Sequence, residues 1–293
     1  MDKKVKDTLQ SAYNSYLMQF DNNELEPNEE LLKYDFPFLN GKQWRIPFAE
    51  FIVEGELREL TNLLNSWRQR LKQWHAWNNV IGDGEDSESW MLRNEFLEAT
   101  VHECLLKPSS IRDTITSVAT ASLHQIRLST DPTYKDYLIT DPVSITGPQK
   151  YPTRKKKEEQ LIDIANYWPS GKEFIEELTK LDSPDYKKQT YDYRNLHSHT
   201  IGPRLGIGET KLLKRSIIET EELVDNGDRT FQLRKIPGKL SVTYGFGGTP
   251  PLDLNQARTL NLTEFKQALS CYARYVFLCK EAVSSLNSLT KRT

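Results

Sequence analysis

The chain has 293 residues, of which 37% are hydrophobic and 27% charged, and its formal net charge at pH 7 is −2. This composition predicts a soluble globular protein with enough apolar residues for a core. It excludes an extended basic coat of the kind that binds nucleic acid through charge alone. The polar first residues lack the apolar segment of a signal peptide, and no apolar run reaches membrane-spanning length. We therefore expect a cytoplasmic protein with no membrane contact.

Residues 4–20 have the apolar spacing of a helix, and residues 21–46 form an aromatic loop interrupted by prolines. A separate N-terminal lobe over residues 1–46 is left open. Residues 47–80 are predicted to form one long helix, because apolar residues recur at alternating spacings of four and three. These residues are Val53, Leu57, Leu60, Leu64, Trp67, Leu71 and Trp74.

Two more helices are predicted at residues 88–106 and 110–128, followed by a long irregular crossing at 129–155 that contains several prolines. Within the first of them, His102 and Glu103 begin like a zinc-protease motif, but Leu106 stands where the second histidine is needed. The three cysteines show neither metal-ligand spacing nor a disulfide framework, so we expect no metal and no cofactor.

The densest basic run, Arg154-Lys155-Lys156-Lys157, follows this crossing. Such a run is more often the solvated start of a helix than an RNA contact, and both interpretations are kept. A helix is predicted at 157–167. Ser170 and Glu173 then have the spacing of a capping box that opens a helix to about residue 181.

Beyond Gly208 the sequence pattern favours strands. Residues 216–224, 230–235 and 239–246 are predicted to form an antiparallel β-meander, inserted at 214–247, with Pro237-Gly238 as its second turn. Asn261 and Glu264 are expected to cap the last helix. The apolar residues of that helix repeat the spacing of four and three, so we expect it to pack against residues 53–74.

The richest chemistry lies between Tyr191 and Thr200, where Arg194, Asn195, His197 and His199 occur within six residues. Ser183 and Pro184 suit the start of a helix, and Gly202-Pro203 cannot continue one. The sequence therefore predicts a helix from about residue 184 whose last turns carry these side chains. Arginine offers a planar cationic fork to phosphate, and histidine transfers protons near neutral pH.

The segment Arg194-Asn195-x-x-x-His199 resembles the arginine–polar–histidine motif of the HEPN superfamily, helical proteins that include many toxin and abortive-infection ribonucleases. The resemblance covers about ten residues directly. It implies a mainly α fold in which residues 1–293 form one HEPN-type helical bundle, with the motif facing a cleft, commonly at a dimer interface. The implied partners are RNA, a second copy of the chain and a cognate antitoxin protein.

The activity that the resemblance implies is metal-independent RNA cleavage. His199 would transfer the proton, Arg194 would hold the scissile phosphate, and Asn195 would orient the histidine or the phosphate. Helix geometry leaves His197 open as the proton-transfer residue, because residues three apart share a face, whereas residues five apart point about 140° away from each other. Two other classes of function also remain. One is a non-catalytic HEPN-like module that binds nucleotide, RNA or protein, and the other is a purely structural interaction protein.

Overall fold

The computed structural model describes residues 2–21, 25–82, 84, 86–144, 146–148 and 150–287. The chain is mainly helical with a small two-stranded antiparallel sheet, which confirms the predicted fold class. It divides into two compact units. The first comprises residues 1–190 and 254–293, and the second comprises residues 191–253. The second unit contains both the Arg-His motif and the strands.

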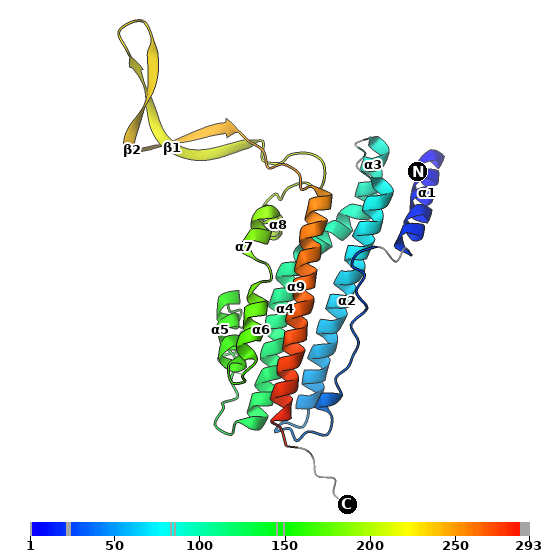
Figure 1. Cartoon of the computed structure of the whole chain (residues 1–293). Helices are drawn as coiled ribbons and strands as arrows, with labels where there is room; N and C mark the ends of the chain where they lie inside the picture. Colours follow the sequence, from blue (N-terminus) through cyan, green and yellow to red (C-terminus); the bar gives the residue numbers. More distant parts are fainter. Residues whose placement is uncertain are drawn as a thin grey trace, which may run out of the picture. The chain divides into compact units, whose positions relative to one another are not determined.

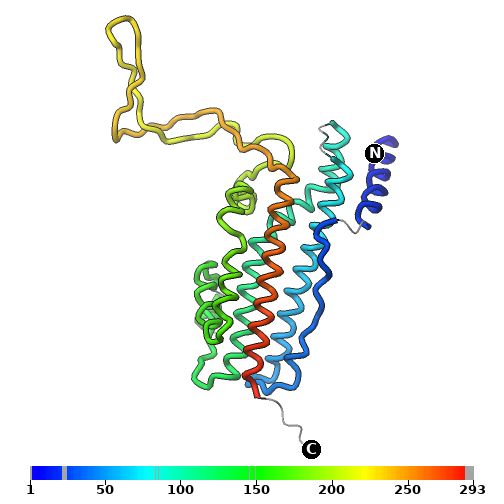
Figure 2. Tube along the Cα trace, in the orientation of Figure 1, coloured from blue at the N-terminus to red at the C-terminus, as the bar shows by residue number. Residues whose placement is uncertain are grey.

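Three long helices form the centre of the first unit: α2 (Ala49–Ile81), α4 (Glu98–Thr130) and α9 (Leu254–Ser284). They lie side by side along most of their length (Figures 1 and 2). All seven predicted apolar positions of α2 are buried, and the predicted contact with the last helix is present, since the rings of Trp67 and Phe265 meet edge to face at 5.4 Å. The spacing of four and three therefore identified the centre of the core.

The predicted break between residues 106 and 110 is wrong. α3 (Ser87–Leu92) leads through a π-helical turn, Arg93–Leu97, into α4, and α4 continues through Pro108. A proline inside a helix cannot donate the hydrogen bond to the carbonyl four residues before it, here Cys104. The side chain of Asn261 on α9 supplies that bond instead, with Nδ2 2.8 Å from the Cys104 carbonyl oxygen.

Asn261 also binds two further groups in the core, so it is not the helix cap that its sequence position suggests. Its Oδ1 accepts the Trp67 Nε1 hydrogen at 2.9 Å, and its Nδ2 donates to the Tyr186 hydroxyl at 3.0 Å. α9 begins seven residues earlier, at Leu254, and Asn261 is completely buried. One amide thus joins α2, α4 and α9 to the segment that leads towards the motif.

The N-terminal segment packs on this core. α1 (Lys3–Phe20) contacts α2, where Tyr16 stacks on Trp77 with ring centroids 4.5 Å apart. The described part of the aromatic loop includes a short helical turn, Pro37–Leu39, and it also contacts α2, since His75 Nδ1 accepts the Glu26 backbone N–H at 3.0 Å. His75 is therefore a packing residue that holds this loop against α2.

Three short helices complete the first unit: α5 (Arg154–Ala165), α6 (Gly171–Thr179) and α7 (Pro184–Gln189). The predicted irregular crossing precedes α5; its residues 145 and 149 lie outside the described residues. The predicted capping box is absent at the start of α6, where Ser170 has no side-chain capping bond. The Ser170 backbone N–H and hydroxyl donate instead to the Glu281 carboxylate of α9, a partner 111 positions away.

The strands of the second unit form one hairpin, β1 (Leu213–Asp225) with β2 (Phe231–Phe246), where the sequence predicted three strands. The predicted turn near Gly227 is present, since Asn226 N–H donates to the Thr230 carbonyl at 3.0 Å. Pro237-Gly238 does not end a strand. It lies in a bulge of β2 opposite Thr220, between the pairs Glu219–Leu240 and Glu221–Lys235. The hairpin bends sharply partway along its length (Figure 1).

All three cysteines, Cys104, Cys271 and Cys279, are buried with free thiols in the central helices. Among the helices described, none is long and apolar enough to cross a membrane.

Candidate functional site

The motif lies on its own short helix, α8 (Tyr193–His199), which corrects the prediction of one helix from residue 184. α7 begins as predicted, with Ser183 Oγ accepting the Tyr186 backbone N–H at 3.1 Å and Pro184 in the first turn. It ends at Gln189, because Tyr191 and Asp192 both have left-handed backbones, with φ of 52° and 51°. L-residues seldom adopt this conformation, and a sequence pattern does not reveal it. Arg194 is therefore in the first turn of a helix rather than the last.

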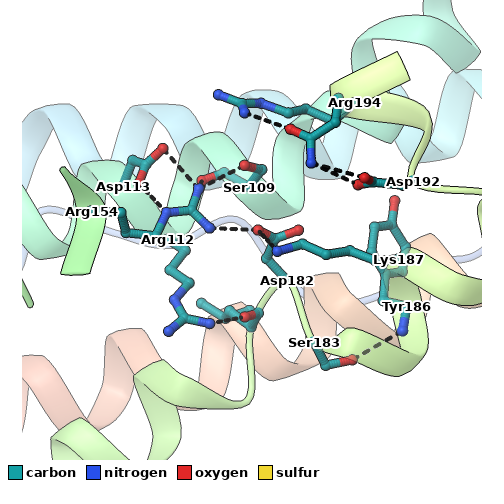
Figure 3. A network of polar contacts seen from close by, with 12 residues as sticks. Ser109, Arg112, Asp113, Arg154, Asp182, Ser183, Tyr186, Lys187, Asp192 and Arg194 are labelled. Atoms are coloured by element: carbon teal, nitrogen blue, oxygen red, sulfur yellow. Dashed lines mark hydrogen bonds and ion pairs between the residues drawn. The ribbon is translucent and has the colours of Figure 1, made fainter. Parts of the chain in front are cut away.

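Arg194 is positioned by a chain of side-chain hydrogen bonds in which each residue orients the next (Figure 3). The Asp192 carboxylate accepts from Asn195 Nδ2 at 3.0 and 2.9 Å, which turns the amide oxygen away from the carboxylate. That oxygen, Oδ1, accepts from Arg194 Nη1 at 3.0 Å. Asn195 is half-buried and Arg194 is exposed, so these hydrogen bonds hold the Arg194 guanidinium in a defined place at the surface. Asn195 was expected from the sequence to orient the histidine or the phosphate, and Asp192 was given no role.

Both motif histidines are exposed on the same helix. His197 is three residues after Arg194 and packs edge to face on Tyr193, with centroids 5.2 Å apart. His199 is the last residue of α8, five after Arg194. Since α8 remains helical through His199, the backbone places His197 on the side of Arg194 and His199 on another side.

The end of α8 agrees with the predicted helix stop. The backbone N–H and the hydroxyl of Thr200 both donate to the Leu196 carbonyl, at 2.8 and 3.1 Å. Gly202 then passes so near the helix that a Cβ there would lie 3.4 Å from the His197 backbone nitrogen. This close return of the chain fixes the side of α8 near His197.

The basic run contains two different kinds of residue. Arg154 is part of an ion-pair network in the first unit (Figure 3). Its Nε and Nη2 donate to both oxygens of Asp113, at 2.6 and 2.9 Å, and its Nη1 donates to Asp182 at 2.6 Å. An RNA phosphate would have to displace these carboxylates from Arg154, so any RNA contact of this run rests on the three lysines.

Among the described residues, the lysines of the run have no such network: Lys155 and Lys156 are exposed, and Lys157 is half-buried. Lys155 is 86% exposed and lies 4.0 Å from Glu159, a weak surface pair. Lys156 lines a groove of about 610 Å³ between α5, the end of α4 and the irregular crossing. Arg127, Lys135, Tyr134 and Tyr137 also line this groove. It therefore combines cations with aromatic rings, as surfaces that bind single-stranded nucleic acid do, but the carboxylates of Glu159 and Asp163 line it as well.

Asp182 and Glu264 complete the network, and sequence analysis did not single out either for this role. Asp182 is 4% exposed, also pairs with Lys187 at 3.1 Å, and has a left-handed backbone. Its backbone N–H donates to the Glu264 carboxylate at 2.8 Å. Burial raises the pKa of Glu264 above its ordinary value. Glu264 was expected to cap the last helix; instead it binds the backbone just before α7.

No group of three or more histidine, cysteine or carboxylate side chains with the arrangement of a metal site occurs in the part of the chain that the structure describes. Comparisons with protein-family models, curated proteins and solved structures find no match to this chain. The resemblance to the HEPN superfamily therefore rests on the motif residues themselves.

Proposed function

We propose that this protein is a metal-independent endoribonuclease of the HEPN type, acting in a defence or toxin–antitoxin system. The observation that carries the proposal is the chain from Asp192 through Asn195 to Arg194. It presents an ordered, exposed guanidinium on the helix that also carries two exposed histidines. A guanidinium held in this way can bind a phosphodiester and stabilise the charge that develops on it during cleavage.

In the proposed reaction the ribose 2′-hydroxyl oxygen attacks the adjacent phosphorus, and the bond from phosphorus to the 5′-oxygen breaks. A histidine accepts the 2′-hydroxyl proton, and a second group donates a proton to the leaving oxygen. The products are a 2′,3′-cyclic phosphate and a 5′-hydroxyl. His199 is the proposed proton-transfer residue because the resemblance assigns it this role, and His197, which α8 places on the side of Arg194, is the alternative. Asn195 positions Arg194. Because one histidine cannot readily be base and acid in the same step, a homodimer that presents two motifs fits this chemistry.

The test is product analysis on RNA in excess EDTA. The wild-type protein should leave cyclic-phosphate ends, and Arg194→Ala should lose cleavage. Arg58→Ala, which removes an exposed arginine of α2, should cleave like wild type. If EDTA abolishes cleavage and a divalent ion restores it, the mechanism is wrong. If Arg194→Ala cleaves as well as Arg58→Ala, Arg194 has no role in the reaction.

A non-catalytic module that binds nucleotide, RNA or protein is the second candidate. It is favoured by the regular helix through His199, which separates the directions of Arg194 and His199 by about 140°. In that case RNA would bind in a salt-dependent manner and remain intact, whereas a purely structural protein would show no salt-dependent RNA binding.

A further inference from the structure

The hairpin of the second unit has one strongly apolar face. Alternate residues along a strand share a face, and directly paired residues share it too. Between the bulge and the open end of the hairpin, the register therefore places six large apolar side chains together. They form what we call the apolar face: Leu213, Ile217, Leu240, Val242, Tyr244 and Phe246.

Every residue of the apolar face is exposed, from 48% for Val242 to 96% for Phe246. An aromatic side chain carries roughly 150–250 Å², so Phe246 and Tyr244 alone expose on the order of 300 Å². The four aliphatic residues bring the face close to the roughly 800 Å² that each partner buries in a standard interface. Scattered apolar residues on a surface are ordinary, but a continuous patch of this size marks a contact surface.

The opposite face of the same strands has a different composition. Lys214, Ser216, Ser241 and Thr243 lie there, with Ile218 as its large apolar member. The hairpin is thus amphipathic, although it has only two strands. An isolated two-stranded hairpin is at best marginally stable in water, so covering its apolar face would stabilise it.

We propose that the apolar face binds the apolar face of a second copy of this chain, around a two-fold axis that passes beside Ile217 and Val242. In a two-fold contact, residue i of one copy meets residue j of the other, and j meets i. Here the strands of the two copies run antiparallel across the interface, β1 over β1 and β2 over β2. Tyr244, two residues from the axis, then meets Leu240 of the second copy.

The charged residues of this face fit the same arrangement. Apart from the six apolar residues, the paired positions of this face hold only Arg215 and Glu219, which lie two residues on either side of Ile217. The two-fold rotation places Arg215 of each copy against Glu219 of the other, so the centre of the face is complementary to itself in charge. Because these two charges cancel, the face lacks the positive excess that nucleic acid or an anionic membrane would require.

This inference does not depend on the proposed ribonuclease activity. The motif and the hairpin nevertheless belong to the same compact unit. The segment that leads from the motif into β1 also pairs with the segment that follows β2, since Thr210 and Thr249 exchange backbone hydrogen bonds at 3.1 and 2.7 Å. A contact through the hairpin would therefore bring two copies of the motif-bearing unit together.

The experiment is a charge exchange on the full-length protein, followed by light scattering and analytical ultracentrifugation over a range of concentrations. The wild-type protein should be a dimer at micromolar concentration. Arg215→Glu or Glu219→Arg alone should weaken dimerisation roughly 10–100-fold, because like charges then face each other twice across the axis. The double variant should restore it. Lys214→Glu changes the charge equally on the opposite face and should have no effect.

Ile217→Asp gives a second test, because the axis brings the two copies of this residue together. It should abolish the dimer, whereas Ser216→Asp should not, and far-ultraviolet circular dichroism should show the helical content unchanged in both. A monomeric wild-type protein would overturn the proposal, as would a dimer that these variants leave unchanged. It would also fail if the double charge variant stayed as weak as the single ones. If the face binds RNA, a membrane or another protein instead, the wild-type protein is a monomer or its dimer does not respond to these variants.

Discussion

Replacing Asn261 with alanine tests how α4 accommodates Pro108. The substitution removes the hydrogen bond to the Cys104 carbonyl and leaves the Trp67 indole N–H and the Tyr186 hydroxyl without their amide partner. A buried polar group that loses its partner costs about 1–3 kcal/mol, and the cavity adds to this. Because such costs are not additive, we expect the free energy of unfolding to fall by about 3–5 kcal/mol.

The assay is urea unfolding followed by circular dichroism, with Asn14→Ala on the exposed surface of α1 as control, which should change stability by less than about 0.5 kcal/mol. The sharper measurement is a double-mutant cycle with Pro108→Ala. Alanine restores the backbone N–H that the Cys104 carbonyl lacks, so Asn261→Ala should cost about 1–2 kcal/mol less in that background. Equal costs in both backgrounds would refute the idea that Asn261 compensates for the proline.

Three further predictions concern the motif, the basic run and the buried carboxylate. His199→Ala should lower RNA cleavage by a factor of roughly 10² to 10⁴, while His197→Ala should retain most of it; the reverse order in a single-turnover assay would move the role to His197. Replacing Lys155, Lys156 and Lys157 with alanine should weaken RNA binding and reduce its salt dependence, and an unchanged salt slope would exclude these lysines from the contact. Because the pKa of Glu264 is raised in the folded state, the stability of the wild-type protein should fall as pH rises through that pKa. The stability of Glu264→Gln relative to wild type, measured by urea unfolding, should therefore increase over the same pH range. A difference that does not vary with pH would contradict this assignment.

The parts of the fold that sequence predicted correctly depend on local repetition. The spacing of Val53, Leu57 and Leu60 defines one side of a helix, whatever packs against it. Ser183 and Pro184 mark the start of α7 because a helix cap involves only neighbouring residues. The turn after β1 is local in the same way.

Most of the errors involve partners that are distant in sequence or backbone conformations without a sequence signal. The predicted break between residues 106 and 110 is wrong because Asn261, whose amide compensates for Pro108, lies 153 positions further along the sequence. The capping box predicted at Ser170 is wrong because the actual partner of Ser170, Glu281, lies on another helix far along the sequence. At the candidate site, the sequence identified Arg194, Asn195 and both histidines as neighbours. The left-handed backbone at Asp192, which starts α8 and places the carboxylate beside Asn195, could not be deduced from residue types.

Because its three cysteines are buried, the folded protein should react only slowly with thiol reagents. Thiol reagents attack the thiolate, and burial raises the pKa of all three thiols, that of Cys279 to about 12. Alkylation therefore requires the central helices to separate, so the alkylation rate reports how often the bundle opens. A cysteine introduced on the hairpin would react first and alone, which allows a single dye or spin label to be placed there without altering any native residue of the core.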